Sequence, residues 1–290
     1  TENRMTVVEG WFSGRSYDRL PSPDELPSIV TTELINNAAL NSKAFILQDG
    51  EKLQLVGNRT ECALLLMLRT WNVDYVKLRS DRETSMVKMF GFSSARKMAS
   101  VLYKHEDNSK YMLYNKGAAE WVLKRCTSLL NENGQVVPMG DAERTQLVDT
   151  VTSMAKRGLR CICLSYRSVP LDNPDQPEDF LEDSDKLDND LTALAIVGIK
   201  DPVRKEVPDA VRTCQGAGIV VRMVTGDNIF TATHIARECG ILGDNGIALE
   251  GPKFRDMAAH DLLPILPVLR VLARSSPEDK LTLVRLLKQQ

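Results

Sequence analysis

The chain has 290 residues, of which 43% are hydrophobic and 26% are charged, and its formal net charge is -2. This length exceeds one typical domain, and the composition is that of an ordinary soluble globular protein, so we expect two domains with real cores rather than disorder. The small net charge and the scattered basic residues argue against a nucleic-acid partner.

Residues 10 to 190 mix helices with alternating strands. The segment "TECALLLMLRTW" predicts a helix, and its apolar run is far shorter than the roughly 20 residues that cross a bilayer. The stretches "MASVLYKH" and "YMLYNK", joined by "EDNS", predict an antiparallel hairpin. "DAERTQLVDTVTSMAKR" predicts a helix capped by Asp141 and stopped by Gly158. The acidic residues 172 to 190 predict a solvated loop between the domains.

The chain has six cysteines, and the spacing of Cys161 and Cys163 fits neither a zinc ribbon nor a redox motif. In an extended strand these two side chains share one face. We therefore expect small, buried, reduced thiols and a reducing, cytoplasmic setting.

From Leu191 onward, apolar strands alternate with helices, which predicts a parallel sheet covered on both faces. The predicted strands are "LTALAIVGI", "IVVRMVT" and "VLRVLA". Gly216 and Gly240 stand where left-handed C-terminal caps belong. Ser276 can cap the last helix, with Pro277 at its first position.

A short polar stretch, Thr225-Gly226-Asp227, ends one of these strands just before a helix. Open α/β sheets place their ligands at this edge. The hydroxyl and the free backbone N–H groups can hold an anion, and Gly226 lets it approach closely, so we expect a phosphate site. The alternative is that Asp227 or Asn228 merely caps the helix, and the stretch alone does not decide between the two.

A second carboxylate, Asp201, follows the preceding predicted strand, and Arg204 adds a planar donor fork suited to phosphate. Alone, the Asp-Pro pair is only a turn signal. Because two successive parallel strands would both end in a carboxylate, we expect the two ends to lie side by side.

The motifs "DPVR", "MVTGDN" and "ARSSPEDK", in this order, resemble the phosphorylation domain of P-type cation-transporting ATPases, which has the haloacid-dehalogenase-like fold. The opening "TENRM" resembles the segment after the family's Asp-Lys-Thr-Gly-Thr-Leu-Thr motif, with Thr1 as its last Thr. Residues around "MVTGDN" and "SPEDK" are most similar to the plasma-membrane, calmodulin-regulated class of calcium pumps.

The resemblance implies an α/β fold class in two domains. Residues 1–9 and 191–290 would form a partial, Rossmann-like, parallel-sheet phosphorylation domain. Residues 10–190 would form an inserted α+β nucleotide-binding domain with an antiparallel sheet and flanking helices.

The resemblance also implies an ATP site in the middle domain. "NKGAAEWVL" is similar to the Lys-Gly-Ala motif, which implies that Lys116 lies in the ATP cavity and that Gly117 lets the backbone pass close to the nucleotide. "GFSSARKMAS" resembles the segment whose Phe stacks on adenine and whose Lys reaches the phosphates, here Phe92 and Lys97. Glu61 would accept a hydrogen bond from the adenine amino group. The competing explanations are a buried core Phe92, a surface Lys116 and a Glu61 that only favours a helix N-terminus.

The resemblance also implies roles for three further basic residues. "KRGLRCICLSYR" resembles the strand whose Arg contacts the phosphates, here Arg160, and Arg274 matches an arginine that links the nucleotide to the phosphorylation domain. Lys280 matches the lysine that neutralises the transferring phosphoryl group. The expected catalytic residues are Thr225, Gly226, Asp227 and Lys280, and the expected nucleotide-binding residues are Glu61, Phe92, Lys97, Lys116, Gly117, Arg160, Asp201, Arg204 and Arg274.

Two family features are not among these 290 residues: the phosphorylated Asp, expected just upstream of Thr1, and the Gly-Asp-Gly-x-Asn-Asp segment, which supplies a magnesium ligand. We therefore expect ATP to bind as MgATP, with no metal ligand from this chain and no turnover by it alone. The intact pump would sit in the plasma membrane or an internal membrane, with these residues on the cytoplasmic side. Its partners would be its transmembrane and actuator domains and, through a regulatory tail elsewhere, calmodulin.

Three alternatives stay open. The pump could carry another cation. A free-standing dehalogenase-like phosphatase with a cap domain would need an Asp-x-Asp motif on the first strand, where the chain has "TENRMTVV". A dinucleotide-binding module would need Gly-x-Gly-x-x-Gly after a strand, whereas "CQGAGI" follows a helix.

Overall fold

The computed structural model describes residues 5–50, 52–107, 109–171 and 180–289. Contacts divide the chain into two compact units. Unit 1 holds Thr1–Glu2, Thr152–Arg160 and Asp201–Gln290, and unit 2 holds Asn3–Val151 and Cys161–Lys200. Thr1, the expected end of the phosphorylation motif, lies outside the described residues.

Unit 2 is built on a large sheet with the strand order β2-β1-β11-β10-β7-β6-β5, in which β8 also pairs with β11 and β9 pairs with β8. β6 and β7 form the predicted antiparallel hairpin, with Met98 opposite Gly117. β11 runs antiparallel to β1 and parallel to β8. The strands are β1 (Thr6–Phe12), β2 (Arg15–Tyr17), β5 (Met86–Phe90), β6 (Met98–Lys104), β7 (Lys110–Ala118), β8 (Cys126–Leu130), β9 (Val136–Pro138), β10 (Arg160–Pro170) and β11 (Leu191–Lys200).

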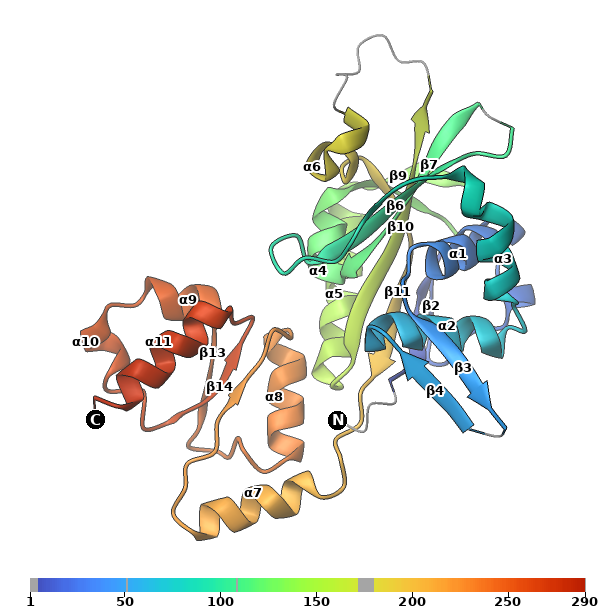
Figure 1. Cartoon of the computed structure of the whole chain (residues 1–290). Coiled ribbons are helices and arrows are strands. Elements are labelled where there is room, and N and C mark those ends of the chain that lie inside the picture. The colour runs from blue at the N-terminus through green and yellow to red at the C-terminus, as the bar shows by residue number, and fades with distance from the viewer. Residues whose placement is uncertain (1–4, 51, 108, 172–179, 290) are drawn as a thin grey trace. The chain divides into compact units, whose positions relative to one another are not determined.

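Helices cover both faces of this sheet, with α1, α2 and α3 on one side and α4 and α5 on the other (Figure 1). A separate hairpin of β3 (Phe45–Asp49) and β4 (Lys52–Val56) lies beside α2. The helices are α1 (Ser28–Leu40), α2 (Arg59–Thr70), α3 (Tyr75–Arg82), α4 (Ala119–Val122), α5 (Asp141–Lys156) and α6 (Ser184–Leu187). Short 3-10 turns stand at Pro23–Glu25, Glu83–Ser85, Leu123–Arg125 and Phe180–Glu182.

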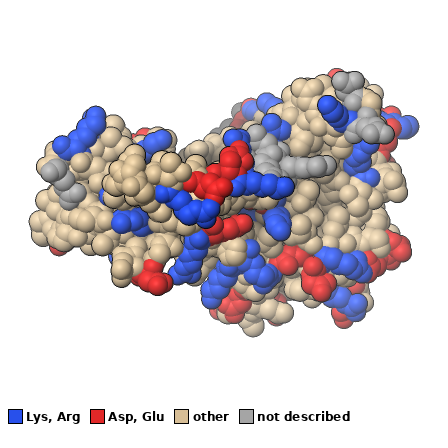
Figure 2. Space-filling view, turned by 90° about the horizontal axis from the view of Figure 1, so that it is seen from below, with Lys and Arg blue, Asp and Glu red and all other residues tan. Residues whose placement is uncertain are grey.

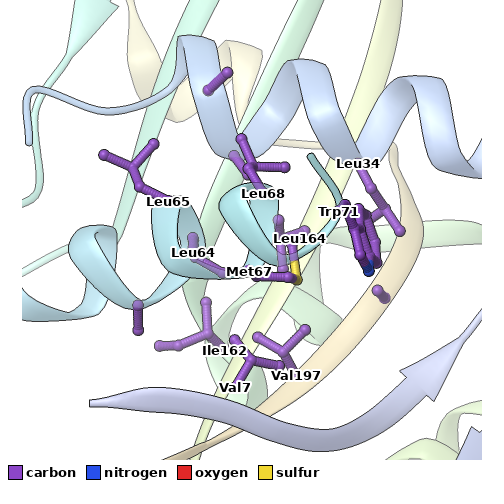
Figure 3. Packing of buried hydrophobic residues seen from close by; sticks show 14 of the residues in the cluster. Val7, Leu34, Leu64, Leu65, Met67, Leu68, Trp71, Ile162, Leu164 and Val197 are labelled. Carbon is purple, nitrogen blue, oxygen red and sulfur yellow. The ribbon is translucent and has the colours of Figure 1, made fainter. Parts of the chain in front are cut away.

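The core of unit 2 forms where α2 meets the sheet. Leu64 and Leu68 of α2 are fully buried in one cluster with Ile162, Leu164 and Val197, and Figure 3 shows Leu64 on the side of α2 that faces Ile162. Full burial of each such leucine contributes roughly 1.5–3 kcal/mol. This packing fixes the N-terminus of α2, which carries residues of the candidate site.

Strand β10 shows the alternation expected of a strand covered on both faces. Ile162 and Leu164 belong to the α1 and α2 core, whereas Cys161 is hydrogen-bonded to the Val151 carbonyl of α5. All six cysteines are free thiols, and every one except Cys214 is buried. Their burial agrees with the expected small, reduced core thiols.

Unit 1 is a three-stranded parallel sheet with the order β12-β14-β13 and helices on both faces. α7 and α8 pack with Val271 and Ala273 on one face, and α9, α10 and α11 pack with Leu272 on the other. The elements are α7 (Val207–Gly216), β12 (Met223–Val224), α8 (Ile229–Glu238), β13 (Ile247–Glu250), α9 (Gly251–Asp256), α10 (Ala259–Leu262), β14 (Leu269–Ala273) and α11 (Pro277–Leu287). The expected α/β fold class is confirmed.

One strand lies in a different sheet from the one predicted. Leu191–Lys200 was expected beside "IVVRMVT" in the parallel sheet, but it pairs with β1 and β8 in the large sheet of unit 2. A continuous apolar run predicts burial on both faces, and the large sheet, covered by helices on both sides, provides this equally well. The prediction that Asp201 and Asp227 end neighbouring parallel strands is therefore wrong.

The expected solvated loop between the domains, residues 172 to 190, lies outside the described residues up to position 179. Its described part belongs to unit 2, forms a 3-10 turn and α6, and includes the buried Leu187 and Asp188, so this prediction is wrong there.

Two further local predictions are wrong. The apolar residues Ile219 and Val220 are not in a strand and are 56% and 45% exposed, because β12 begins only at Met223. Gly216 is the last residue of α7, and the left-handed position belongs to Gly218, with a φ of 76°. The cap at Gly240, with a φ of 75°, is confirmed.

Among the described residues, no helix is both long and apolar enough to cross a membrane. On the face seen in Figure 2, lysine and arginine side chains are interspersed with aspartate and glutamate. That face therefore carries no broad field of a single sign of the kind that attracts polyanions.

Candidate functional site

Unit 2 contains a pocket of about 210 Å³ at the N-terminus of α2. This volume exceeds the roughly 150 Å³ of an engineered apolar cavity that binds benzene, so the pocket has room for a flat ring. It is lined by Asn41, Ser42, Lys43, Gly57, Asn58, Glu61, Met89, Phe90, Gly91, Phe92 and Ala99. Two of the predicted site residues, Glu61 and Phe92, therefore share one pocket.

Glu61 lies in the first turn of α2, where Asn58 caps the helix by accepting hydrogen bonds from the N–H groups of Thr60 and Glu61. Its Oε2 accepts hydrogen bonds from the Ser42 hydroxyl and the Lys43 N–H, both at 3.1 Å, and from the Ala44 N–H at 3.2 Å. Its Oε1 accepts one from the Lys116 ammonium at 3.0 Å. The carboxylate is thus held in a fixed orientation, which goes beyond favouring a helix N-terminus.

Lys116 is only 5% exposed, so the alternative of a surface lysine is wrong. Burial lowers the pKa of the Lys116 ammonium, although Glu61 opposes this shift. Burial alone would raise the pKa of Glu61, but the charge and hydrogen bond of Lys116 and the hydrogen bonds of Lys43 and Ser42 outweigh it, and the pKa is lowered. The lowered pKa keeps the Glu61 carboxylate ionised at neutral pH, which gives the pocket one ordered carboxylate.

Phe92 is 57% exposed, so the alternative of a buried core residue is wrong. It follows β5 in a loop that leads to Lys97, and its ring lines the pocket. An exposed aromatic ring in a pocket offers a face on which a base can stack, at about 1–3 kcal/mol per base.

Lys97 and Gly117 meet through their backbones. Lys97 has a φ of 58°, and its carbonyl accepts a hydrogen bond from the Ala118 N–H at 3.0 Å. A Cβ on Gly117 would lie 2.4 Å from that carbonyl and 2.6 Å from the Cβ of Met98. Gly117 therefore permits the close approach of β7 to the end of the Phe92 loop.

In unit 1, Asn228 caps α8 by accepting a hydrogen bond from the Phe230 N–H at 2.8 Å. The capping alternative is therefore confirmed for Asn228, whereas Asp227 is not the cap. Its Oδ2 accepts a hydrogen bond from the Thr225 hydroxyl at 2.8 Å, and its N–H donates back to that hydroxyl at 3.1 Å. A Cβ on Gly226 would meet no atom of the described residues within 4 Å, its chain neighbours aside, so the chain is open at this point.

Arg160 connects the two predicted carboxylates. Its Nε donates to Asp227 at 3.1 Å, and its guanidinium lies 3.7 Å from the carboxylate of Asp201. The side chain of Asp201 is only 7% exposed. These two carboxylates share an arginine even though they do not end neighbouring strands of one sheet.

Three predicted residues of unit 1 remain: Arg274 contacts the same turn, and Lys280 and Arg204 are exposed. Arg274 donates its N–H to the Asp227 carbonyl at 2.9 Å and its guanidinium to the Gly226 carbonyl at 3.1 Å. Lys280 is exposed in the first turn of α11, after the predicted cap Ser276, and Arg204 is exposed between β11 and α7.

In unit 2 the structure thus brings Glu61 and Phe92 into one pocket, whereas Lys97, Lys116 and Gly117 do not line it. In unit 1 it brings Arg160, Asp201 and Arg274 together with the turn of residues 225–227, whereas Lys280 and Arg204 stay at exposed positions.

Sequence reasoning missed the groups that orient Glu61. Ser42 and the N–H groups of Lys43 and Ala44 belong to the turn after α1, 17 to 19 residues before Glu61. The only signal was the polar pair Asn41-Ser42 after an apolar helix, which predicts a turn but not its partner. Among the described residues, no group of three or more His, Cys, Asp or Glu side chains could hold a metal ion.

The sequence pattern of the family described as "P-type ATPase, cytoplasmic domain N" matches residues 30–206, which is more than half of the chain. This range includes the pocket of unit 2.

Known calcium-transporting ATPases are similar to this chain over almost its whole length. It is 42% identical over 302 aligned residues to plasma membrane calcium-transporting ATPase 1 of Sus scrofa, covering 98% of this chain and 24% of that protein. It is 43% identical over 289 residues to calcium-transporting ATPase PAT1 of Dictyostelium discoideum, covering 99% of this chain and 25% of that protein. The identity to plasma membrane calcium-transporting ATPase 4 of Homo sapiens is 41%, with 98% and 24% covered. The chain spans about a quarter of the length of these curated relatives.

Proposed function

The chain belongs to the P-type ATPase family, whose cytoplasmic domain N it contains, and from this membership we propose that it binds ATP as part of a calcium-transporting pump. The observation that carries the proposal is the shared pocket of Phe92 and Glu61. Phe92 offers a ring face for adenine, and Glu61 offers an oriented acceptor for the adenine amino group. Lys116 keeps that acceptor ionised.

The polar turn of unit 1 is proposed as the phosphate-handling part of the intact pump. Thr225, Gly226 and Asp227 supply a hydroxyl, an open backbone and a carboxylate before a helix. Arg160 and Arg274, which both contact this turn, add positive charge. We propose a catalytic role for the exposed Lys280, nucleotide binding for the exposed Arg204 and phosphate binding for Lys97. These three roles rest on the family resemblance alone. The proposed domain bounds likewise remain 1–9 and 191–290 for phosphorylation and 10–190 for nucleotide binding.

The described residues do not fit a metal site of their own, because they hold no group of three or more metal-binding side chains. We therefore propose that Mg²⁺ enters with the phosphates of ATP. The phosphorylated Asp would stand just before Thr1, and the 290 residues alone would bind ATP without turning it over. The intact pump would lie in the plasma membrane or an internal membrane with this part in the cytoplasm. It would work with its transmembrane and actuator domains and with calmodulin.

Calorimetry on the 290-residue chain tests the proposal. ATP should bind saturably, and Phe92→Ala and Lys116→Ala should each weaken binding about tenfold, because they remove a stacking surface and the partner of Glu61. GTP should bind more weakly than ATP, because guanine has a carbonyl oxygen in place of the adenine amino group and this oxygen would face the Glu61 carboxylate. Absence of binding, or binding that is indifferent to both substitutions, would overturn the proposal.

Two alternatives have direct tests. Hydrolysis of a generic phosphate ester that Asp227→Asn abolishes would favour a free-standing phosphatase. Transport of a different cation by vesicles that contain the full-length pump would show that calcium is not its cargo.

A further inference from the structure

A buried carboxylate outside the pocket binds the loop that carries Phe92. Asp188 ends α6 just before β11 and is only 1% exposed. Its Oδ1 accepts hydrogen bonds from the Ser100 hydroxyl of β6 and, at 2.9 Å, from the Asn115 amide of β7. Its Oδ2 accepts one from the guanidinium of Arg96, which belongs to the Phe92 loop. An ion buried this deeply is stable only because it is paired and hydrogen-bonded.

Arg96 connects this carboxylate to the loop at several points. Its guanidinium also donates to the Ser100 hydroxyl at 3.1 Å and lies 5.9 Å from the centre of the Phe90 ring. Its backbone N–H donates to the Ser93 hydroxyl at 3.1 Å. The arginine therefore fixes both the start of the loop, at Phe90 and Ser93, and its end, beside β6.

The end of the loop is in an unfavourable conformation that other contacts must maintain. Lys97 has a φ of 58°, which costs a non-glycine residue roughly 1 kcal/mol or more. Its N–H donates to the Ser93 carbonyl at 2.8 Å, and its carbonyl accepts from Ala118. Because Lys97 follows Arg96 directly, releasing Arg96 removes the charged anchor next to this strained residue.

We propose that Asp188 is a positioning residue for nucleotide binding: through Arg96 it holds the loop from Gly91 to Lys97 so that the Phe92 ring faces the pocket. Asp188 does not line the pocket, so the proposed effect on the nucleotide is indirect and passes through the loop. The proposal rests on the proposed ATP-binding function. It predicts that a buried group with no ligand contact controls affinity, because a preorganised ring loses less conformational entropy on binding.

Calorimetry with ATP on the 290-residue chain tests this role. Asp188→Asn keeps the size of the side chain but removes its charge, and ATP affinity should fall about tenfold. In a Phe92→Ala background the same change should have less than a twofold effect, because the loop then has no ring to position. Arg144→Ala is the matched control: Arg144 donates to the Leu123 and Cys126 carbonyls and does not line the pocket. It should lower stability and leave ATP affinity unchanged.

Two further measurements keep the test decisive. If Asp188→Asn does not fold, Arg96→Gln, which removes the same ion pair from the loop side, should give the same loss of affinity. Amide hydrogen exchange at Lys97 and Ala118, measured without ATP, should accelerate in either variant and not in Arg144→Ala.

The outcomes separate the two proposals. If the unmodified chain binds ATP and Asp188→Asn and Arg96→Gln bind it equally well, the positioning role is wrong and the proposed function stands. If the loss of affinity persists undiminished in the Phe92→Ala background, Asp188 does not act through the ring, and the inference is also wrong. If the unmodified chain does not bind ATP, both proposals fail together.

Discussion

The ammonium of the buried Lys116 lies 3.0 Å from the carboxylate of the partly buried Glu61, and these two groups come from positions 55 residues apart. Replacing Lys116 by Met should destabilise unit 2 by about 2 kcal/mol, because it leaves a partly buried carboxylate without its countercharge. The loss should fall below the ~3–5 kcal/mol typical of a broken buried pair, since Ser42, Lys43 and Ala44 still donate to Glu61.

Urea unfolding measures this loss. Lys104→Met, at the exposed end of β6, is the matched control and should change the unfolding free energy by less than about 0.5 kcal/mol. The double variant Glu61→Gln/Lys116→Met should be more stable than Lys116→Met alone, because it leaves no uncompensated charge. Equal stabilities of the single and double variants would contradict the buried pair.

The lowered pKa of Glu61 predicts a specific dependence of stability on acid. Its ordinary pKa is 4.5, and the lower value in the folded chain means that the ionised group stabilises the fold at neutral pH. This contribution is lost as the pH falls below 4.5 and through the folded-state pKa. The difference in unfolding free energy between the natural chain and Glu61→Gln should therefore be largest near neutral pH and shrink in acid.

Urea midpoints recorded from neutral pH down to about pH 3 give this difference. The same difference in urea midpoint is measured for Glu25→Gln as a comparison, because Glu25 is a surface carboxylate paired with Arg19. A difference for Glu61→Gln that grows in acid would mean that the pKa of Glu61 is raised rather than lowered.

Gly117 is predicted to be needed for close packing. A methyl group there would meet the Lys97 carbonyl at 2.4 Å, so Gly117→Ala should displace the Phe92 loop and cost about 1–3 kcal/mol. Gly91→Ala in the same loop meets no atom within 4 Å and should be nearly neutral for stability. Thermal unfolding compares the two, and equal midpoints would show that β7 does not depend on this approach.

Much of the fold is predictable from local pattern. The β6–β7 hairpin, α2, α8 and the capping box of Ser276 and Asp279 each depend on residues close in sequence. The sheet to which Leu191–Lys200 belongs is not predictable in this way. Its apolar run requires burial on both faces, and only the tertiary arrangement decides which sheet supplies it.

The candidate site, like the fold, is predictable from the sequence only in part. Glu61, Phe92 and Lys116 could be nominated from motifs, yet the exposure of Phe92 and the burial of Lys116 follow from packing between segments far apart in the chain. The anchors Ser42 and Asp188 carry no motif at all. A serine after a helix and an aspartate before a strand are common at surfaces, and only the fold reveals what they bind.

Gly226 offers a test of the proposed phosphate turn. Its position is open, so Gly226→Ala should change the unfolding free energy by less than about 0.5 kcal/mol. The methyl group would nevertheless obstruct an anion that approaches the backbone, and the affinity for inorganic phosphate should fall several-fold. Gly243→Ala, at another open position of unit 1, should leave both quantities unchanged. Phosphate titration followed by amide chemical shifts would detect the difference, and equal affinities in both variants would argue against the turn as an anion site.

The central claim is that adenine binds in the pocket between Phe92 and Glu61, and a titration of the 290-residue chain with ATP, followed by amide chemical shifts, tests it most directly. We predict saturable changes at pocket residues Ser42, Gly57, Gly91 and Ala99, with the indole N–H of Trp121, which does not line the pocket, left unchanged. Phe92→Ala should require about tenfold more ATP for the same changes. Saturable changes that avoid the pocket, or the absence of any at ATP concentrations found in cells, would contradict the account.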